Sequence, residues 1–152
     1  MADVGSIKKV KLNLPFKYFG PESTVSEIAD MMDLEDIGAV PVLNNQYLLL
    51  GLVSERDIVR KLVKAGRDSD LVTAKDIMTE DVISVQKKTP IIEALKIMRE
   101  NNIRHLPVID DNHKMINFIS LRDLITNSQN KKINYVLLAF ALILLPAILI
   151  LK

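Results

Sequence analysis

The feature that most constrains the fold of this chain is an internal repeat at a constant spacing. The segment GLVSERD at residues 51–57 recurs as NFISLRD at residues 117–123. Ser54 and Ser120 occupy the same place in the two copies, and the difference between their numbers is 66. A constant spacing indicates one supersecondary unit used twice. We therefore expect two equivalent halves.

Length and composition narrow the class of protein. A chain of 152 residues is long enough for one compact domain or for two small halves that share a core. Its net charge of +1 offers no large cationic field for nucleic acid, so we expect no nucleic-acid partner. The absence of cysteine excludes a disulfide framework and is compatible with a reducing compartment. The N-terminus has no apolar signal region.

Each copy opens with a helix. Thr24 and Glu27 have the spacing of a capping box, in which a hydroxyl and a carboxylate satisfy free backbone N–H groups. In the second copy the sequence predicts Thr89 as the cap and Pro90 as the first helical residue. Apolar residues at helical spacing follow in both copies, as expected for a helix with one buried face.

Two strands and a second helix follow in each copy. Residues 38–43 form a short apolar run, residues 44–46 have turn composition, and residues 47–53 are so apolar that we expect a strand buried on both faces. Ser54 opens a helix that we expect to reach about Ala65, with Gly66 as its stop. The predicted order is therefore α-β-β-α, twice.

A proline lies inside the first strand of each copy, at Pro41 and Pro107. Proline cannot donate to a β-ladder, so either this strand is an edge or its proline lies at an unpaired position. An unpaired backbone beside an apolar strand offers hydrogen bonds to a flat ligand. We place the boundaries at 1–14 for an N-terminal arm, 15–72 and 73–130 for the two repeats, and 131–152 for a C-terminal tail.

The tail is strongly apolar. Residues 133–151 carry no charge, and at about 1.5 Å per residue they reach roughly 28 Å, close to the hydrocarbon thickness of a bilayer. Lys131 and Lys132 precede this segment and would place the repeats on the cytoplasmic side of the membrane. We expect a single-pass membrane anchor. The alternative is an apolar helix buried in an oligomer.

Enzyme motifs are absent from the sequence. The five glycines form neither a GxGxxG fingerprint nor a Walker A loop. Only His105 and His113 are histidines, and neither lies in a metal-binding motif. No nucleophile–base pair is suggested by the spacing. We expect no enzyme activity, no catalytic residue and no metal site.

What remains is Ser-x-Arg-Asp at a strand-to-helix junction, twice. Serine at the N-cap with aspartate three residues later is good capping chemistry and needs no ligand. Capping does not need the arginine, which both copies keep. The alternative is a nucleotide site in which aspartate accepts ribose hydroxyls and arginine binds phosphate. The side chains of Val40, Val53, Leu106 and Ile119 would then sandwich a base.

These residues resemble a pair of cystathionine-β-synthase (CBS) domains, also called a Bateman module. The matching segments are AVPV at 39–42 with GLVSERD, RHLPVID at 104–110 with ISLRD at 119–123, and IM at 77–78 followed by VISV at 82–85. The resemblance covers about residues 15–127. It implies an α/β (α+β) fold of two βαββα repeats, packed by their sheets about a pseudo-twofold axis. It also implies a homodimer and adenosine-containing ligands such as AMP, ADP, ATP or S-adenosylmethionine.

The resemblance further implies which residues contact the ligand. Asp57 and Asp123 would hold ribose, and Ser54 and Ser120 would support ribose or phosphate. The backbone of residues 40–41, 106–107 and 83–85 would meet the base, and arginines with His105 would meet phosphate. The full set is Val40, Pro41, Ser54, Arg56, Asp57, Ile83, Val85, Arg104, His105, Leu106, Pro107, Ser120, Arg122 and Asp123.

The copies differ at two places that affect these expectations. Gly38-Ala39 of the first copy is replaced by Arg104-His105, and Gly51 is replaced by Asn117. The sequence leaves open whether His105 is structural and whether both clefts bind. The leading hypothesis is a membrane-tethered adenine-nucleotide sensor that acts on a separate partner protein. The alternative is an assembly module that dimerises without a nucleotide.

Overall fold

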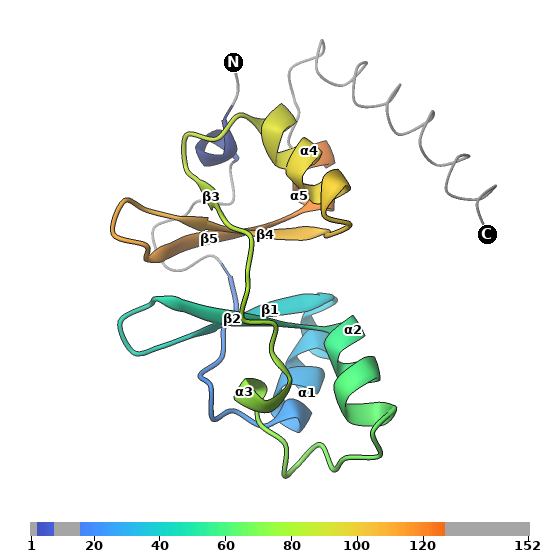
Figure 1. Ribbon diagram of the computed structural model, residues 1–152. Helices are drawn as coiled ribbons and strands as arrows, with labels where there is room; N and C mark the ends of the chain where they lie inside the picture. The colour runs from blue at the N-terminus through green and yellow to red at the C-terminus, as the bar shows by residue number, and fades with distance from the viewer. Residues whose placement is uncertain (1–2, 8–15, 127–152) are drawn as a thin grey trace, which may run out of the picture.

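The computed structural model of the chain describes residues 3–7 and 16–126. The described chain forms two halves whose sheets face one another, with helices on the two outer faces (Figure 1). The predicted arrangement of two repeats packed by their sheets is confirmed. The predicted anchor at residues 133–151 lies outside the described residues. Within the described ranges, no helix has the length and apolar character needed to cross a bilayer.

The first half follows the predicted order. It contains α1 (Val25–Glu35), β1 (Ala39–Leu43), β2 (Leu49–Ser54), α2 (Glu55–Asp57), the π-helical segment η2 (Ile58–Val63) and α3 (Ala74–Ile77). Thr24 caps α1 as the sequence predicts: its Oγ accepts from the Glu27 backbone N–H, and the Glu27 carboxylate accepts from the Thr24 N–H. The second helix is divided into α2 and η2, and Gly66 follows it with a positive φ of 63°.

The second half repeats the order with one extra short strand. It contains β3 (Val85–Gln86), α4 (Ile91–Glu100), β4 (His105–Ile109), β5 (Met115–Ser120) and α5 (Leu121–Thr126). The predicted cap of α4 is wrong by one residue, because Pro90 occupies the N-cap position. The Thr89 hydroxyl instead accepts a hydrogen bond from the Gln86 N–H.

The sheets explain both prolines. β1 pairs with β2 in the first half, and β4 is the middle strand between β3 and β5 in the second. Phe19 forms a parallel bridge with Val42, and Val85 pairs with Val108 in the same way. Each residue of the second pair lies 66 positions after its equivalent in the first pair. The Phe19 N–H donates to the Pro41 carbonyl, and the Phe19 carbonyl accepts from the Leu43 N–H, so the missing proline N–H is not needed. The unpaired position is confirmed, and an edge position is wrong for β4. Among the described residues, only the second half has a strand, β3, that precedes its first helix.

Backbone details obey the same spacing of 66. Four non-glycine residues with positive φ form two equivalent pairs, Asp36 with Asn102 and Tyr47 with His113. Both hairpins shift register at equivalent points, between Val42 and Leu43 and between Val108 and Ile109. Such backbone is unusual for non-glycine residues. Its recurrence at equivalent positions shows that the two copies share backbone conformation as well as sequence pattern.

The pseudo-twofold axis passes between the two hairpins. Leu48 forms an antiparallel bridge with Lys114, its own equivalent in the other copy. The Met115 N–H also donates to the Tyr47 carbonyl at 3.0 Å. A residue that pairs with its own equivalent lies close to the symmetry axis. The hairpins therefore join the halves at one end of the interface.

The core of each half includes a segment from outside its α-β-β-α unit. In the first half this segment follows the unit, and in the second half it lies at the start of the chain. In the first half, the core includes Val72, Ala74 and Ile77, so it extends past the boundary drawn after residue 72. In the second half, the core includes Val4 and Ile7, which are 1% and 2% exposed. Residues 3–7 of the predicted N-terminal arm thus pack against the second repeat, although the first repeat follows them in sequence.

The predicted second strand of the first copy needs two corrections. It begins at Leu49, because Tyr47 has a φ of 63° and lies in the turn. Its burial alternates, with Gly51 and Val53 buried and their neighbours half-buried, so it is not buried on both faces. Leu49 lines a cavity between the halves, whereas Leu50 packs against the core of the first half.

Candidate functional site

The two Ser-x-x-Asp motifs adopt the same geometry at the starts of α2 and α5. Asp57 Oδ2 accepts from the Ser54 N–H at 3.0 Å and from the Ser54 hydroxyl at 2.6 Å. Asp123 Oδ2 accepts from Ser120 at 2.9 and 2.8 Å. Each serine hydroxyl in turn accepts from the aspartate N–H. The capping interpretation is therefore confirmed in both copies.

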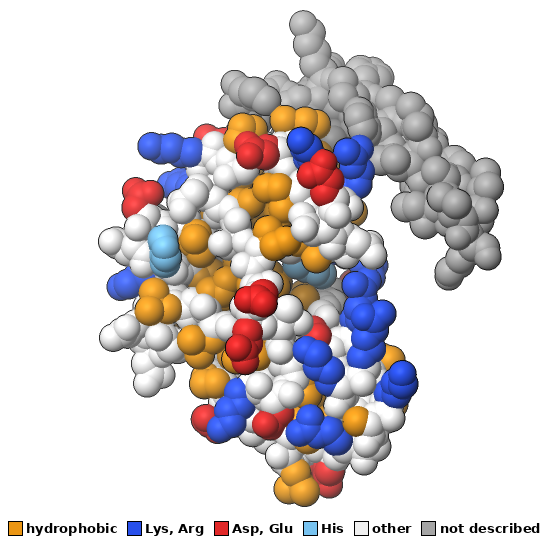
Figure 2. All heavy atoms as spheres, in the orientation of Figure 1, with side chains coloured by type: hydrophobic (Ala, Val, Ile, Leu, Met, Phe, Trp, Pro, Cys, Tyr) orange, Lys and Arg blue, Asp and Glu red, His pale blue; other side chains and the backbone are white. Residues whose placement is uncertain are grey.

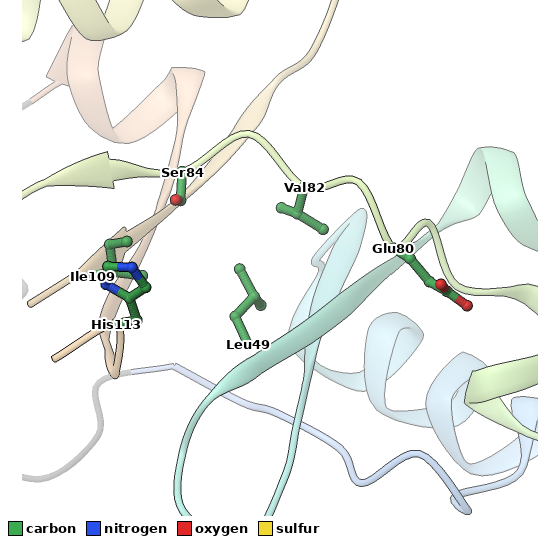
Figure 3. Close-up of a pocket in the computed structure, with 6 residues that line it drawn as sticks. All are labelled: Leu49, Glu80, Val82, Ser84, Ile109 and His113. Atoms are coloured by element: carbon green, nitrogen blue, oxygen red, sulfur yellow. The ribbon is translucent and has the colours of Figure 1, made fainter.

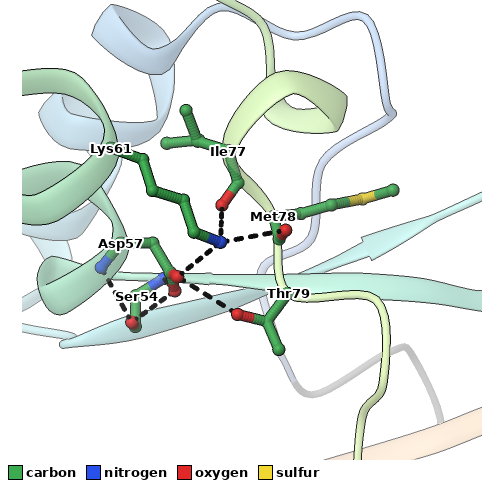
Figure 4. Close-up of polar contacts among 6 residues, drawn as sticks. All are labelled: Ser54, Asp57, Lys61, Ile77, Met78 and Thr79. Atoms are coloured by element: carbon green, nitrogen blue, oxygen red, sulfur yellow. Dashed lines mark hydrogen bonds and ion pairs between the residues drawn. The ribbon is translucent and has the colours of Figure 1, made fainter. Parts of the chain in front are cut away.

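The second carboxylate oxygen of Asp57 faces the linker between the halves, which comprises residues 72–84 (Figure 4). Asp57 Oδ1 accepts from the Thr79 hydroxyl at 3.1 Å and forms an ion pair with Lys61 Nζ at 3.0 Å. Lys61 Nζ also donates to the carbonyls of Ile77 at 2.7 Å and Met78 at 3.2 Å. This cluster ties the first helix start to the chain that leads into the second half.

Electrostatics keep Asp57 ionised. Burial raises its pKa, but the hydrogen bonds from Ser54 and Lys61 outweigh burial, so the pKa lies below its usual value. An ionised carboxylate with one oxygen committed to the cap can offer its other oxygen to hydroxyl donors. In the present arrangement Thr79 and Lys61 hold that oxygen.

The predicted phosphate-binding arginines all lie on the surface. Arg56, Arg104 and Arg122 are exposed. Arg122 lies 3.6 Å from Asp36 of the other half, in an ion pair with both side chains largely exposed. Figure 2 shows Lys and Arg side chains gathered along one side of the half that contains α2. The arginines thus provide cationic charge near the helix starts, in a solvated setting.

His105 differs from the predicted phosphate ligand. Its ring stacks on Phe118 with centroids 5.4 Å apart and an interplanar angle of 17°. Burial lowers the pKa of His105, and the charge of Arg104 adds to that effect, while Asp123 and Glu55 only partly oppose it. A neutral, stacked ring is poorly suited to bind phosphate. The structural interpretation left open by the sequence fits this geometry better.

The predicted sandwich of apolar side chains is wrong. Val40, Val53 and Leu106 are 0% exposed and Ile119 is 1% exposed, and all four belong to the cores beneath the helices. Pro41 and Pro107 are buried on the alternate face of their strands, toward the other half.

A cavity of about 180 Å³ lies between the halves beside the linker. Its lining consists of Leu49, Glu80, Val82, Ser84, Ile109 and His113 (Figure 3). The sequence prediction chose the flanking residues Ile83 and Val85. Ile83 is 38% exposed and Val85 is buried in the second core, and neither lines the cavity. Ser84 belongs to the segment 83–85 whose backbone was expected to meet the base, and its side chain is the one from that segment that lines the cavity.

No group of three or more potential metal ligands occurs in the part of the chain that the structure describes. The arrangement offers capped carboxylates, exposed arginines and a small interface cavity. It is suited to holding a small polar molecule.

The comparisons with known proteins agree with this architecture. The family model described as "CBS domain" matches residues 4–64 and 74–130. The chain belongs to the CBS domain family. It is 39% identical over 105 residues to an uncharacterized protein of Methanopyrus kandleri, covering 69% of this chain and 54% of that protein. It is 31% identical over 105 residues to hypoxic response protein 1 of Mycobacterium tuberculosis, covering 69% and 73%.

This CBS pair spans only about half to three-fifths of the first curated relatives that it matches, 54% and 62%. Among solved structures it is similar to a signal-transduction protein with CBS domains from Burkholderia ambifaria, with a TM-score of 0.75, 30% identity and coverage of 86% and 96%. CBSX2 in complex with AMP gives a TM-score of 0.72 at 21% identity, covering 87% and 99%. The CBS domain pair of protein MJ0100, in complex with 5-methylthioadenosine and S-adenosylmethionine, gives 0.68 at 21%, covering 82% and 93%. The last two share the fold.

Proposed function

We propose that this CBS pair is a non-enzymatic regulatory module that binds an adenosine-containing ligand between its repeats. The observation that carries the proposal is the duplicated Ser-Asp geometry at equivalent helix starts. In each copy one aspartate oxygen is committed to the cap. In the first copy the other oxygen is held by a hydroxyl and an ammonium, which are donors that ribose hydroxyls can replace.

Two further observations support the proposal. CBSX2 and the MJ0100 pair share this fold and were solved with AMP, 5-methylthioadenosine and S-adenosylmethionine. The exposed arginines of this chain are suited to the phosphates of AMP, ADP or ATP. A ligand held between the halves would favour one arrangement of them and so shift a population, which a partner protein would sense.

The first test is ligand-dependent melting of residues 1–152 in detergent with AMP, ATP and S-adenosylmethionine. A ligand present at 100 times its Kd should add about 2.7 kcal/mol of stability. Absence of any shift with all three ligands would remove the proposed function.

The second test asks whether the aspartates do more than cap. Asp57→Ala and Asp123→Ala should each be compared with Asp76→Ala, because Asp76 forms the same capping box with Thr73 at 2.8 and 2.7 Å, at α3. If the proposal is right, at least one of the first two variants weakens AMP binding about tenfold or more, and Asp76→Ala leaves it unchanged. Equal affinities in all three variants would show that the Ser-x-x-Asp motif only caps its helix.

An assembly module is the second candidate, and exposed apolar side chains on the outer helices favour it. Val59 and Val63 of η2 are 58% and 64% exposed, and Ile92 and Ile125 of the second half are 47% and 43% exposed. Such residues suit a homodimer that packs helix against helix. Sedimentation of the chain with and without Val59→Lys and Val63→Lys tests this. A chain that is monomeric at all concentrations would exclude it.

We also propose that residues 133–151 anchor the module in the cytoplasmic membrane with its repeats on the cytoplasmic side. The apolar length of this segment and the preceding Lys131 and Lys132 support the proposal. Fractionation of cells that express residues 1–152 tests it. Recovery in the soluble fraction without detergent would exclude the anchor.

A further inference from the structure

The helix that follows β2 carries a basic patch on its outer face. The patch consists of Val59, Arg60, Val63, Lys64 and Arg67, which lie in η2 and in the turn after it and are all exposed. Their spacing of three or four residues places them on one side of a helix. Val59 and Val63 are 58% and 64% exposed. Exposed apolar side chains among cations suit a surface that contacts lipid headgroups.

The positive charge of the patch exceeds that of the acids around it. The patch carries +3 within a chain whose formal net charge is +1, so the rest of the chain carries −2. Asp57 is paired with Lys61, and Asp68 accepts from the N–H two residues later. The pKa of Asp76 is lowered mainly by the hydrogen bonds of its own cap and less by the charge of Arg67. A cationic field concentrated on one face favours an anionic partner.

The position of the patch relates it to the C-terminal tail. Thr126, the last residue of α5, is the equivalent of Arg60 at the spacing of 66. The pseudo-twofold axis runs from the bridge between Leu48 and Lys114 to a point between α2 and α5 (Figure 1). Equivalent positions lie at equal depth along such an axis. The patch and the end of α5 therefore lie at the same end of the molecule, opposite the hairpin turns.

The length of the tail limits how far this end can stand from a membrane. Residues 127–132 separate Thr126 from the apolar segment 133–151. At about 3.3–3.6 Å per residue, these six residues span at most roughly 20 Å. That distance is only about twice the Debye length of about 10 Å at 0.1 M salt. An anchored segment 133–151 would thus hold the patch close to the charges of the lipid surface.

We propose that the basic patch docks on the anionic surface of the membrane that holds the tail. Arg60, Lys64 and Arg67 contact lipid headgroups, and Val59 and Val63 enter the interface between headgroups and acyl chains. This inference rests on the proposed anchor and adds a second contact to it. The contact gives the module one orientation, with its hairpin turns away from the bilayer. That orientation is sensitive to salt, because salt screens the attraction to lipid charge.

A second copy of the chain is the competing occupant, because exposed valines also suit a contact between helices. In a twofold dimer the same patch lies on both sides of the interface. A contact centred on the patch would bring three cations of each copy together, and like charges that face each other are unfavourable. An anionic bilayer instead pairs with the cations and accepts the valines.

The experiment places a fluorescent label in the patch of residues 1–152 reconstituted in vesicles. The chain has no cysteine, so Val63→Cys gives a single site for a polarity-sensitive label. Asn112→Cys, in the exposed turn between β4 and β5, is the matched site at the other end of the molecule. The vesicles contain phosphatidylcholine alone or with about one-third phosphatidylserine. Emission is compared at about 0.05 M and about 0.5 M KCl.

Charge variants show whether the cations of the patch cause the contact. In the Val63→Cys chain, Arg60→Gln and Lys64→Gln together remove two charges of the patch. The matched control removes two charges from exposed residues of the second half, Lys88→Gln and Lys114→Gln. Melting in detergent identifies any variant that fails to fold. The comparison of lipids and salt needs neither charge variant, and Val59→Cys can replace Val63→Cys as the labelled site.

We expect the emission at residue 63 to rise about twofold or more, and to move to shorter wavelength, in anionic vesicles at low salt. Neutral vesicles, high salt or the double change in the patch should remove most of this response. The control charge variant should keep it, and the label at residue 112 should not respond.

Equal emission at residue 63 in anionic and neutral vesicles would overturn the inference. Equally low emission would place the patch in water, and equally high emission would assign it to a second copy of the chain. A response that survives high salt or the double change in the patch would also overturn it. In these cases the chain still floats with the vesicles, and the proposed anchor stands. A chain that floats with neither kind of vesicle would overturn both the anchor and this inference.

Discussion

The two halves of this CBS pair use the same backbone at equivalent positions and complete it with different side chains. Gly51 of β2 lies against the linker, and a Cβ there would be 2.7 Å from Met78 Sδ and 2.9 Å from the Thr79 carbonyl. Its equivalent, Asn117, is 4% exposed, and its Nδ2 has no partner among the described residues. One position thus demands glycine and the other tolerates a buried amide.

The cores show a similar contrast. The first half is completed by the linker that follows it, and the second by the N-terminal residues Val4 and Ile7. The comparison teaches that duplication kept the turns, the strand registers and the caps at Ser54 and Ser120, because these follow from local sequence. The surroundings of each half diverged, because they depend on which other segment packs there. The predictions below test that division.

The largest effect is expected where a distant segment completes a core. Ile7→Ala should lower the free energy of unfolding by about 2–5 kcal/mol, because it removes a side chain that is 2% exposed. Ile77→Ala should cost a similar amount in the first half. Urea unfolding at pH 7 measures both. Leu34→Ala, at a side chain 79% exposed, is the control. If Ile7→Ala matches that control, the N-terminal segment does not belong to the second core.

Exchange of the equivalent residues Gly51 and Asn117 is expected to be asymmetric. Gly51→Asn should cost about 1–3 kcal/mol by overpacking against Met78 and Thr79. Asn117→Gly should cost less, because it removes a buried amide nitrogen that lacks a partner. Thermal unfolding measures both, and Gly20→Ala, which meets nothing within 4 Å, is the control. Equal losses for the two exchanges would show that the surroundings are equivalent after all.

The link between Asp57 and Lys61 should contribute a smaller amount. Lys61→Met removes the ion pair and two hydrogen bonds to linker carbonyls, and we expect a loss of about 1 kcal/mol, since the lysine is 40% exposed. Lys64→Met, on the exposed surface, should lose almost nothing. The folded pKa of Asp57 is depressed, so its contribution is present above its unfolded pKa and is lost as pH falls through the folded pKa. Asp57→Asn should therefore make the free energy of unfolding fall less steeply at acidic pH. An unchanged fall would contradict the role assigned to Asp57.

The smallest effect concerns His105, which has an exposed histidine, His113, as its matched control. The folded pKa of His105 is depressed, so the unfolded state binds more protons between the two pKa values. Stability should therefore be fully present above the unfolded pKa of about 6.5 and should decline as pH falls toward the folded pKa. His105→Gln should reduce this decline, measured as the free energy of unfolding from pH 7 to 5. A decline that disappears in His113→Gln instead would contradict the assignment.

Much of the local structure could be predicted from the sequence. The spacing of 66 gave the two copies, and Thr24, Ser54 and Ser120 gave helix starts, because capping depends on residues three apart. The prolines at 41 and 107 predicted strand positions where no backbone N–H is needed for the ladder. In the structure, the Phe19 backbone bonds the groups on either side of the missing Pro41 N–H. The cap of α4 was missed by one residue because threonine and proline are both favourable near a helix start.

The site was less predictable. The helix-start aspartates follow from their spacing, but the engagement of Asp57 with Thr79 and Lys61 depends on the path of the linker through space. Hydrophobic pattern could not say which face of β1 and β4 meets helices, so the side chains of Val40 and Leu106 were assigned to the wrong side.

By itself, the sequence determined a duplicated unit with its caps and turns, because these are set by contacts between near neighbours and by a repeated pattern, and its motifs gave the resemblance to CBS domains. Only the tertiary structure decided that residues 3–7 complete the second core, and that Thr79 and Lys61 hold the free oxygen of Asp57. Those features arise from segments that meet after long stretches of chain, and no local pattern of residues specifies such meetings.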